Sequence, residues 1–550
     1  MARPRTFLRV AALVAAAAVA LAACGTGPGS ASGATLRWGF SLPTSWDPVT
    51  SSTGNDINTI SLVYASLTQL DEKATAVPGL AESWKYNADG TAVTFTLRPN
   101  LTFTDGTPLN ADAVKQSLLR GKTQQNSLLK DQLATIKDIT VAGDRDVTLQ
   151  LAAPDYQVPN LLAGKTGAIV SPAAFTKDAA AIPTAPVGAG PFKFESFVPE
   201  SKAVLVKNPG YWDAADVKID RLELTPTTDA ATVIAAVQSG ALDVSYIPGN
   251  QVAQAKAAGL EVDVIDSLQV NQVDVHSGLA PLTDRRVVEA LKYAVDRKQI
   301  IDVVNAGVGD VVYQPFPKGY VAFDPSLDTA FAYDPAKAKQ LLADAGYAPG
   351  QLALTVTVNS ISQSTAELVQ QQLQAVGVNA TIKVVPPGSS TWQQEVYLGR
   401  KAQFALDGTV GRESPVQNLT VVYGPEGLMN TSKVSTPEFL AALDAVRRTP
   451  LDSPGYPRVL QAAVRTGVEM SPSFSLGTQP RVVVRNKKVS PLPHFLSQYR
   501  WEGVTVGGTT LPCPSPAPCG TRPAPWPARR GPAGSVRSAL PPGGCCAPSR

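Results

Sequence analysis

The residue types that most often carry out chemistry are sparse in this chain. Histidine occurs only twice, at His276 and His494, and the two are too far apart in sequence to share a metal-ligand spacing. No Gly-x-Ser-x-Gly segment offers the nucleophile turn of an α/β hydrolase, so an extracellular hydrolase is a disfavoured alternative. The sequence therefore predicts a protein that is not an enzyme, with no catalytic residues, no metal site and no cofactor.

The five cysteines are distributed unevenly. Cys24 stands alone near the N-terminus, and the other four lie near the C-terminus at Cys513, Cys519, Cys545 and Cys546. The main body between them contains no cysteine, so it has neither a disulfide framework nor thiol chemistry.

The N-terminal residues have the parts of a bacterial export signal. Arg3, Arg5 and Arg9 make a basic start, and the apolar run at 10–20 is too short for a comfortable transmembrane helix. The next four residues, Leu-Ala-Ala-Cys24, resemble the bacterial lipobox, in which the cysteine is acylated and becomes the new N-terminus. We predict a signal peptide at 1–23, and a lipidated Cys24 followed by a flexible tether over 24–34. An uncleaved helix or an ordinary signal peptide is the alternative.

Composition places the rest of the chain among globular proteins. The 550 residues are 44% apolar and 17% charged, and this length favours more than one compact unit. The net charge of +3 gives no reason to expect nucleic acid as a partner.

Apolar spacing and turn residues predict alternating strands and helices from residue 35 onward. A strand–helix–strand unit at 352–358, 365–376 and 380–385 implies a parallel pair. Strands are expected at 35–40, 92–98, 147–151, 192–197, 203–207 and 242–246, and helices at 57–70, 110–119 with Asn110 as N-cap, 229–239 ending at Gly240, 284–302 and 335–345.

A series of short segments in a fixed order carries the most specific information. Each is weak by itself, since Asp-Gly-Thr-Pro at 105–108 is simply a good turn. The segments of this series are LAESW at 80–84, TFTLR at 94–98, DGTP at 105–108, GAGPF at 188–192, KNPGYW at 207–212, DRRV at 284–287, AVDR at 294–297, YDP at 333–335 and AGY at 345–347. Taken together and in this order, they resemble the family 5 extracellular solute-binding proteins, the peptide and nickel class of ABC importer receptors, over residues 35–501.

The resemblance implies an α/β fold of the two-lobed, type II periplasmic-binding class, the venus flytrap, with an extra subdomain in lobe I. Lobe I would comprise 35–266, lobe II 267–475, and a return segment to lobe I 476–505. The chain would cross between the lobes near 269–277 and 473–479, and a ligand would close them by a hinge motion.

The resemblance also implies a function without catalysis. The protein would be an extracytoplasmic receptor, lipid-anchored to the membrane and monomeric, that binds a small solute and delivers it to an ABC permease. An oligopeptide is the leading cargo. A surface sensor or adhesion lipoprotein on the same fold, without transport, is the alternative.

The expected binding residues follow a strand of lobe II. In relatives that bind peptides, an acidic residue there pairs with the α-amine of the peptide. The matching stretch at 404–415 contains Gly408, Thr409 where tryptophan is common, Arg412 and Glu413. Either Glu413 supplies the carboxylate, or Arg412 meets an acidic group of the ligand, or the two form a solvated pair on a loop.

Four further residues are candidates for the wall of the cleft. Trp392 and Tyr423 are aromatic side chains of lobe II, and Asn359 lies in a loop between a strand and a helix. Asp47 lies in a lobe I loop that is near the cleft in the family.

The C-terminal residues 506–550 do not fit the family pattern. After Glu502 the chain has no acidic residue and no lysine, and it is rich in Pro, Arg, Gly and Cys. This composition predicts a disordered, non-homologous extension that binding does not require.

Overall fold

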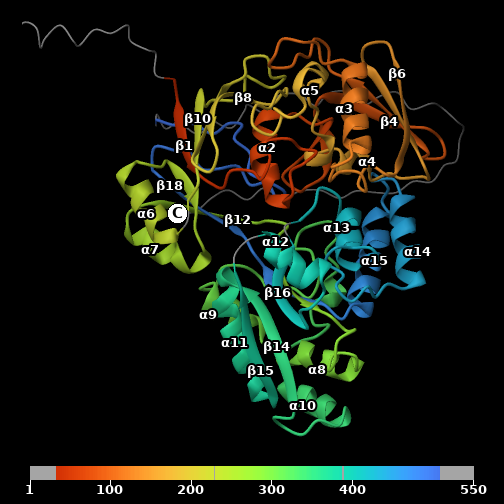
Figure 1. Ribbon diagram of the computed structural model, residues 1–550, viewed down its shortest axis with the longest axis vertical. Coiled ribbons are helices and arrows are strands. Elements are labelled where there is room, and N and C mark those ends of the chain that lie inside the picture. Colours follow the sequence, from red (N-terminus) through yellow and green to blue (C-terminus); the bar gives the residue numbers. More distant parts are fainter. Residues whose placement is uncertain (1–32, 228, 387–388, 410, 508–550) are drawn as a thin grey trace, which may run out of the picture. The chain divides into compact units, whose positions relative to one another are not determined.

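The computed structural model describes residues 33–227, 229–386, 389–409 and 411–507 (Figure 1). The predicted signal peptide at 1–23, Cys24, the tether as far as residue 32, and the predicted tail from residue 508 lie outside the described residues. The described chain is built around two separate main sheets, and we call the parts that carry them lobe I and lobe II.

Lobe I contains a seven-stranded sheet in the order β12-β18-β11-β1-β10-β9-β8. The first strand is parallel to β10 and β11, and the pairs formed by β8, β9, β12 and β18 are antiparallel. Its strands are β1 (Thr35–Gly39), β8 (Phe192–Val198), β9 (Lys202–Lys207), β10 (Arg221–Thr225), β11 (Val244–Tyr246), β12 (Glu261–Ile265) and β18 (Arg481–Arg485), and its helices α6 (Ala230–Ser239) and α7 (Val252–Ala257).

The segment between β1 and β8 forms a subdomain of lobe I. Its antiparallel sheet has the order β4-β5-β7-β6, and α3 packs against β6 and β7. Buried side chains of this sheet and of the seven-stranded sheet belong to one continuous core. The elements are α2 (Ile57–Val63), β2 (Thr68–Leu70), β3 (Ala76–Pro78), β4 (Ala81–Tyr86), β5 (Ala92–Leu97), α3 (Ala111–Thr123), β6 (Ile136–Ala142), β7 (Asp146–Leu151), α4 (Val158–Leu161) and α5 (Pro172–Asp178).

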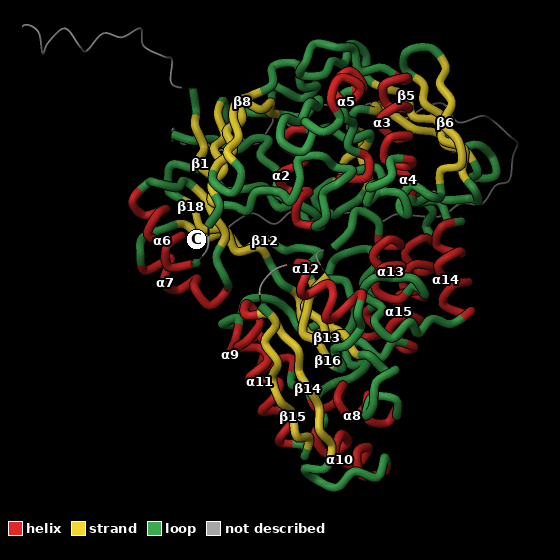
Figure 2. Tube along the Cα trace, viewed as in Figure 1, coloured by secondary structure: helices red, strands yellow, loops and turns green. Residues whose placement is uncertain are grey.

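Lobe II contains a five-stranded sheet in the order β15-β14-β16-β13-β17, and Figure 2 labels β13, β16, β14 and β15 of this sheet. The predicted parallel pair is confirmed, because β14 and β15 pair in parallel with α11 between them in sequence. The elements are β13 (Val270–Val275), α8 (Arg285–Ala294), α9 (Arg297–Val304), α10 (Pro335–Asp344), β14 (Leu352–Asn359), α11 (Gln363–Ala375), β15 (Val378–Val385), α12 (Ser389–Trp392), a π-helix (Gln393–Leu398), β16 (Phe404–Thr409), α13 (Pro415–Tyr423), α14 (Pro437–Arg447), α15 (Tyr456–Met470) and β17 (Phe474–Thr478).

The chain passes between the two main sheets twice, between β12 and β13 and between β17 and β18. The two passages are bonded to each other: the Ser267 hydroxyl donates to the Gln479 carbonyl at 2.7 Å, and the Gln479 N–H donates to the Gln269 carbonyl at 2.9 Å. Two short crossings that lie side by side can serve as a hinge, because the lobes can rotate about them while few other bonds break. The two-lobed α/β architecture implied by the sequence resemblance is therefore confirmed.

The helix predicted at 57–70 is shorter than expected. It ends at Val63, because the Tyr64 backbone is extended (φ −111°, ψ 134°), and the chain continues into β2. Tertiary contact explains the stop, since the Gly190 N–H donates to the Val63 carbonyl at 2.8 Å. Tyr64 and Leu67 are still buried, but in an extended segment of the lobe I core.

The helix predicted at 284–302 is two helices, α8 and α9. The Val295 backbone is extended, and the Asp296 side chain accepts from the Gln299 N–H at 3.0 Å as the N-cap of α9. This break brings the buried Arg297 side chain to the Ser475 carbonyl, 2.8 Å from its Nε. The predicted caps at Asn110 and Gly240 are confirmed.

Candidate functional site

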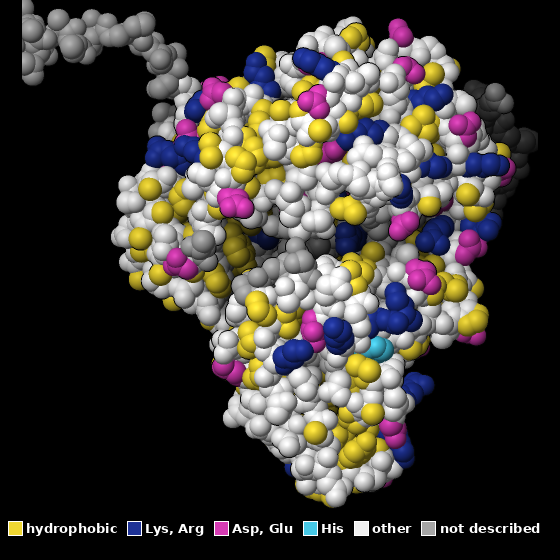
Figure 3. Space-filling model, in the orientation of Figure 1, with side chains coloured by type: hydrophobic (Ala, Val, Ile, Leu, Met, Phe, Trp, Pro, Cys, Tyr) yellow, Lys and Arg dark blue, Asp and Glu magenta, His cyan; other side chains and the backbone are white. Residues whose placement is uncertain are grey.

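A cleft of about 580 Å³, including the solvent at its mouth, is lined by residues of both lobes. Figure 3 shows the molecule hollowed between the lobes, with basic side chains visible inside the hollow. Lobe I contributes Gly54, Ile57, Leu70, Gln132, Ala163, Lys165, Thr166, Ser497 and Gln498, and the other wall consists of Leu268, Gly411, Arg412, Glu413 and Gln417. Sites for small molecules commonly form at such interfaces.

Asp56 organises the lobe I loop beside the cleft. Its carboxylate accepts hydrogen bonds from Thr44 at 2.6 Å, Ser51 at 2.7 Å and Thr53 at 2.8 Å. The loop carbonyls of Ser51 and Thr53 in turn accept from Lys165 Nζ at 2.9 and 3.1 Å. The ammonium group of Lys165 is therefore held by lobe I itself.

Burial determines the electrostatics of Lys165. Removal from water lowers the pKa of its ammonium group, and the negative charges of Glu413 and Asp56 act in the opposite sense. The Lys165 backbone N–H also donates to Glu413 Oε1 of lobe II at 3.4 Å. Lys165 thus connects the two walls of the cleft through its backbone and its charge.

A second group of hydrogen bonds joins the lobes next to the cleft. Gln157 Oε1 of lobe I accepts from the Tyr456 hydroxyl at 3.1 Å and lies 3.4 Å from the Ser414 hydroxyl, both in lobe II. The Tyr156 N–H donates to the Arg447 carbonyl at 2.8 Å. The lobes are therefore in direct contact on the side where α4 meets α13, α14 and α15.

Arg412 and Gln417 face the cleft with unused bonding capacity. Among the described residues, Arg412 has no hydrogen-bond or ion-pair partner. Gln417 Oε1 is buried and likewise has no donor. A guanidinium group and an amide carbonyl left in this state are available to a ligand that offers an anion and an N–H group.

The structure brings Arg412 and Glu413 together in the cleft, whereas Gly408 and Thr409 lie just before it in β16. Gly408 is opposite Asn271 in β13, and Thr409 is opposite Val270. The buried Thr409 hydroxyl lies 3.5 Å from the Val270 carbonyl. These two residues belong to the strand that leads into the loop carrying Arg412 and Glu413, and neither lines the cavity.

Trp392 and Tyr423 are packed within lobe II. The Trp392 Nε1–H donates to Asp407 Oδ2 at 2.9 Å, and burial raises the pKa of this carboxyl group. Tyr423 is buried, with its ring centre 5.9 Å from that of Phe439. Neither aromatic side chain is among those that line the cleft.

Asn359 and Asp47 have structural partners. Asn359 Oδ1 accepts from the N–H groups of Ile361 at 3.0 Å and Ser362 at 3.2 Å, which caps the turn after β14. The buried Asp47 forms an ion pair with Arg120 of α3, with Oδ1 and Nη1 3.0 Å apart. Both lie outside the set of residues that line the cleft.

Several cleft residues were not singled out from the sequence, among them Gln132, Lys165, Thr166, Gln417 and Gln498. They come from separate loops and from the first turn of α13, and they form no local motif. Only Gln417 carried a usable signal, because it follows closely after Arg412 and Glu413 in sequence.

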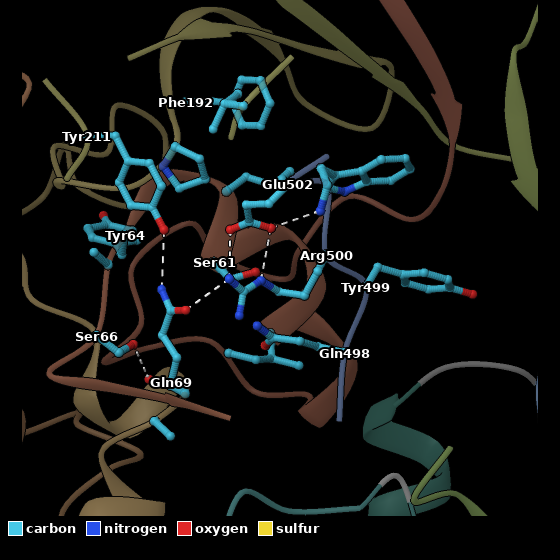
Figure 4. Close-up of a pocket in the computed structure, with 18 residues that line it drawn as sticks. Ser61, Tyr64, Ser66, Gln69, Phe192, Tyr211, Gln498, Tyr499, Arg500 and Glu502 are labelled. Carbon is cyan, nitrogen blue, oxygen red and sulfur yellow. Dashed lines mark hydrogen bonds and ion pairs between the residues drawn. The ribbon is translucent and has the colours of Figure 1, made fainter. Parts of the chain in front are cut away.

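A second pocket lies in lobe I and shares Ile57, Ala163 and Gln498 with the cleft (Figure 4). Arg500 Nη2 donates to Glu502 Oε1 at 2.8 Å and to Gln69 Oε1 at 2.9 Å. Burial by itself would raise the pKa of Glu502, but the Arg500 charge and hydrogen bond outweigh it and lower that pKa. The charged groups of this pocket are thus paired with each other.

The described residues contain neither a cluster of metal-ligating side chains nor a helix suited to crossing a membrane. In that part of the chain, no three His, Cys, Asp or Glu side chains are grouped so that they could hold a metal ion. No helix in the same part has the length and apolar character needed to cross a bilayer.

Comparison with known proteins agrees with the geometry. The family described as bacterial extracellular solute-binding proteins, family 5 Middle, matches residues 75–427. The glutathione-binding protein GsiB of Salmonella typhimurium is 32% identical over 339 residues, which cover 60% of this chain and 65% of that relative. The chain thus spans just under two thirds of the length of this relative.

Two solved structures show the same fold. The periplasmic binding protein DppA from Helicobacter pylori, in complex with the peptide STSA, has a TM-score of 0.76 and 21% identity, covering 86% of this chain and 98% of that one. AgaA from A. tumefaciens R10, in complex with agropinic acid, has a TM-score of 0.74 and 25% identity, covering 86% and 99%.

Two α/β lobes, two bonded crossings and a cleft between the lobes define a type II periplasmic-binding protein. The chain belongs to family 5 of the bacterial extracellular solute-binding proteins. The resemblance seen in the ordered sequence segments is thereby confirmed.

Proposed function

We propose that this protein is the extracytoplasmic receptor of an ABC importer, which binds a short peptide or peptide-like solute between its lobes and delivers it to the permease. The observation that carries the proposal is the cleft, whose walls come from both lobes beside two crossings that can act as a hinge. A solute bound there contacts both lobes, so binding favours the closed arrangement.

The chemistry of the walls supports a peptide-like cargo. The walls combine polar side chains suited to peptide N–H and carbonyl groups with apolar residues such as Ile57 and Leu268. The relative GsiB is named for glutathione, itself a short peptide, and DppA was solved with the peptide STSA. The polar lining consists of Gln132, Thr166, Gln417, Ser497 and Gln498.

A ligand screen tests this function. The full chain is titrated with glutathione, di- to pentapeptides, sugars and metal chelates, and the melting temperature and the radius of gyration are measured. We expect a peptide-like compound to raise the melting temperature and to make the protein more compact. If only a sugar or a metal chelate does so, the peptide-like cargo is wrong, and if nothing does, the receptor function is wrong.

Matched variants locate the binding. Gln417→Ala removes an amide from the cleft and should weaken binding roughly tenfold. Gln340→Ala removes an exposed amide from α10 and should leave affinity unchanged. Equal affinities of the two variants would place the solute elsewhere.

A lipid anchor at Cys24 and monomeric function are part of the proposal. The support for the anchor is the sequence pattern, a basic start, an apolar run and Leu-Ala-Ala before Cys24. Cell fractionation tests it: the native chain should sediment with membranes, and Cys24→Ser should appear in the soluble fraction. Uptake of the bound solute by cells with and without the gene separates transport from a sensor role.

A further inference from the structure

The charged side chains that line the cleft are few enough to be accounted for one by one. Among the described residues they are Lys165, Arg412 and Glu413. Which of them remains available determines the charge of the solute that can bind.

One oxygen of the Glu413 carboxylate takes part in the contact between the lobes. Glu413 Oε1 accepts from the Lys165 N–H at 3.4 Å, and the Glu413 carbonyl accepts from Asn160 Nδ2 at 3.4 Å. Its side chain also lies directly against Gly164, where an ideal Cβ would come within 2.3 Å of Oε1. A solute amine would have to compete with lobe I for this carboxylate.

The Lys165 ammonium group also has partners in the protein. It donates to the Ser51 and Thr53 carbonyls at 2.9 and 3.1 Å and to the Ser51 hydroxyl at 3.3 Å. Its charge is also balanced by Asp56 and Glu413. Lys165 therefore contributes positive potential to the cleft but has a full set of partners.

Arg412 differs from the other two charged side chains of the cleft, because no atom of its guanidinium group has a partner among the described residues. It is partly buried in the cleft wall, and no described residue accepts a hydrogen bond from it or forms an ion pair with it. A guanidinium group binds a carboxylate through two parallel N–H bonds, and partial removal from water strengthens that contact. The neighbouring Gln417 Oε1 still needs a donor.

We propose that the cleft selects solutes that carry a carboxylate, bound by Arg412, and an amide N–H, bound by Gln417, and that a free α-amine is not required. This assignment rests on the proposed function and narrows its cargo to acidic, peptide-like compounds. N-acylated peptides and amino acids with a free carboxylate belong to this class, as do peptides with a free C-terminus.

Blocked peptides test the assignment with the full chain. Ala-Ala-Ala is compared with its N-acetyl form, which keeps the carboxylate, and with its C-terminal amide, which keeps the amine, by calorimetric titration. N-acetylalanine and succinate distinguish a peptide from a simple carboxylic acid. We expect acetylation to leave affinity within about threefold and amidation to lower it roughly 10- to 100-fold.

Variants assign the effect to Arg412. Arg412→Gln should lower affinity for the acetylated peptide by the same roughly 10- to 100-fold and leave the weak binding of the amide unchanged. Arg458→Gln, an exposed arginine of α15, is the matched control and should bind as the native chain does. The melting temperatures of the unliganded variants should agree, which excludes misfolding as the cause.

The possible results distinguish a failure of this inference from a failure of the proposed receptor function on which it rests. If the C-terminal amide binds as tightly as the free peptide while the acetylated form loses affinity, the cleft recognises an amine and the inference is overturned. The same holds if Arg412→Gln binds all forms like the native chain. If no compound in the wider screen binds, the receptor function fails, and the inference with it.

Discussion

Gly164 controls how closely the two lobes can approach. It is buried in lobe I, and an ideal Cβ built on it would lie 2.3 Å from Oε1, 2.5 Å from Cγ and 2.7 Å from Cδ of Glu413. Ordinary contacts of a Cβ are 3.4–4 Å. In Gly164→Ala, the Glu413 side chain must therefore move by about 1 Å or more, or the lobes must stay apart by a similar amount.

The size of the effect follows from the free energy of overpacking. Inserting a methyl group into a filled contact destabilises it by about 1–3 kcal/mol, which corresponds to a roughly 5- to 150-fold change in an equilibrium constant. Because the contact joins the lobes, the loss should appear in ligand affinity, measured by calorimetric titration. The melting temperature of the unliganded protein should change little, because the core of each lobe is untouched.

A double-mutant cycle isolates the cause. Glu413→Ala removes the atoms that the new methyl group meets, so Gly164→Ala in that background should cost almost nothing. Gly455→Ala is the matched control, because the nearest atom to its ideal Cβ is Ser453 Oγ at 3.7 Å. The reasoning is refuted if Gly164→Ala binds as tightly as the native chain, or if its loss persists in the Glu413→Ala background.

Two further predictions concern stability. Burial, together with the charge of Arg297, lowers the pKa of Lys292 to about 7 from 10.5, so its charged form opposes folding below pH 7 and this penalty fades as pH rises toward 10.5. Denaturant titrations should therefore show that the free energy of unfolding of the native chain rises by roughly 2–3 kcal/mol relative to that of Lys292→Met between pH 7 and pH 9. If the difference between the two free energies stays constant over this range, the lowered pKa does not belong to Lys292. Asp47→Asn leaves Arg120 buried without its carboxylate and should destabilise the fold by about 3–5 kcal/mol. Asp302→Asn, in the exposed pair with Lys298, should change stability by less than about 0.5 kcal/mol, and similar losses in the two variants would show that burial is not the cause.

Local patterns predicted only part of the elements, and α13, α14 and α15 were among those not foreseen. Asn110 and Gly240 marked helix ends because capping depends on residues within one turn. The β14–α11–β15 unit was readable for the same reason, since a strand, a helix and a second strand follow one another without interruption. Helix ends that depend on distant contacts could not be predicted from the sequence. The helix that stops at Val63 is an example, because the Val63 carbonyl accepts a hydrogen bond from Gly190, far along the chain.

The same reasoning predicted only the lobe II wall of the candidate site. Arg412 and Glu413 could be placed in the cleft because they follow a lobe II strand in a recognisable family position. The opposite wall could not, since Gln132, Lys165 and Gln498 come together only when the subdomain and the return segment pack around α2.

By itself the sequence determined the family, the two-lobed α/β architecture, and which loop of lobe II brings charged side chains to the cleft. The tertiary structure decided how those charges are used: Glu413 meets Gly164 and Lys165 of the other lobe, and Arg412 is left for the solute. The physical reason is that a charged group is fully available to a solute only if no other part of the protein bonds to it. For Glu413 that bond comes from the backbone N–H of Lys165, which is 248 residues away in sequence and 3.4 Å away in space.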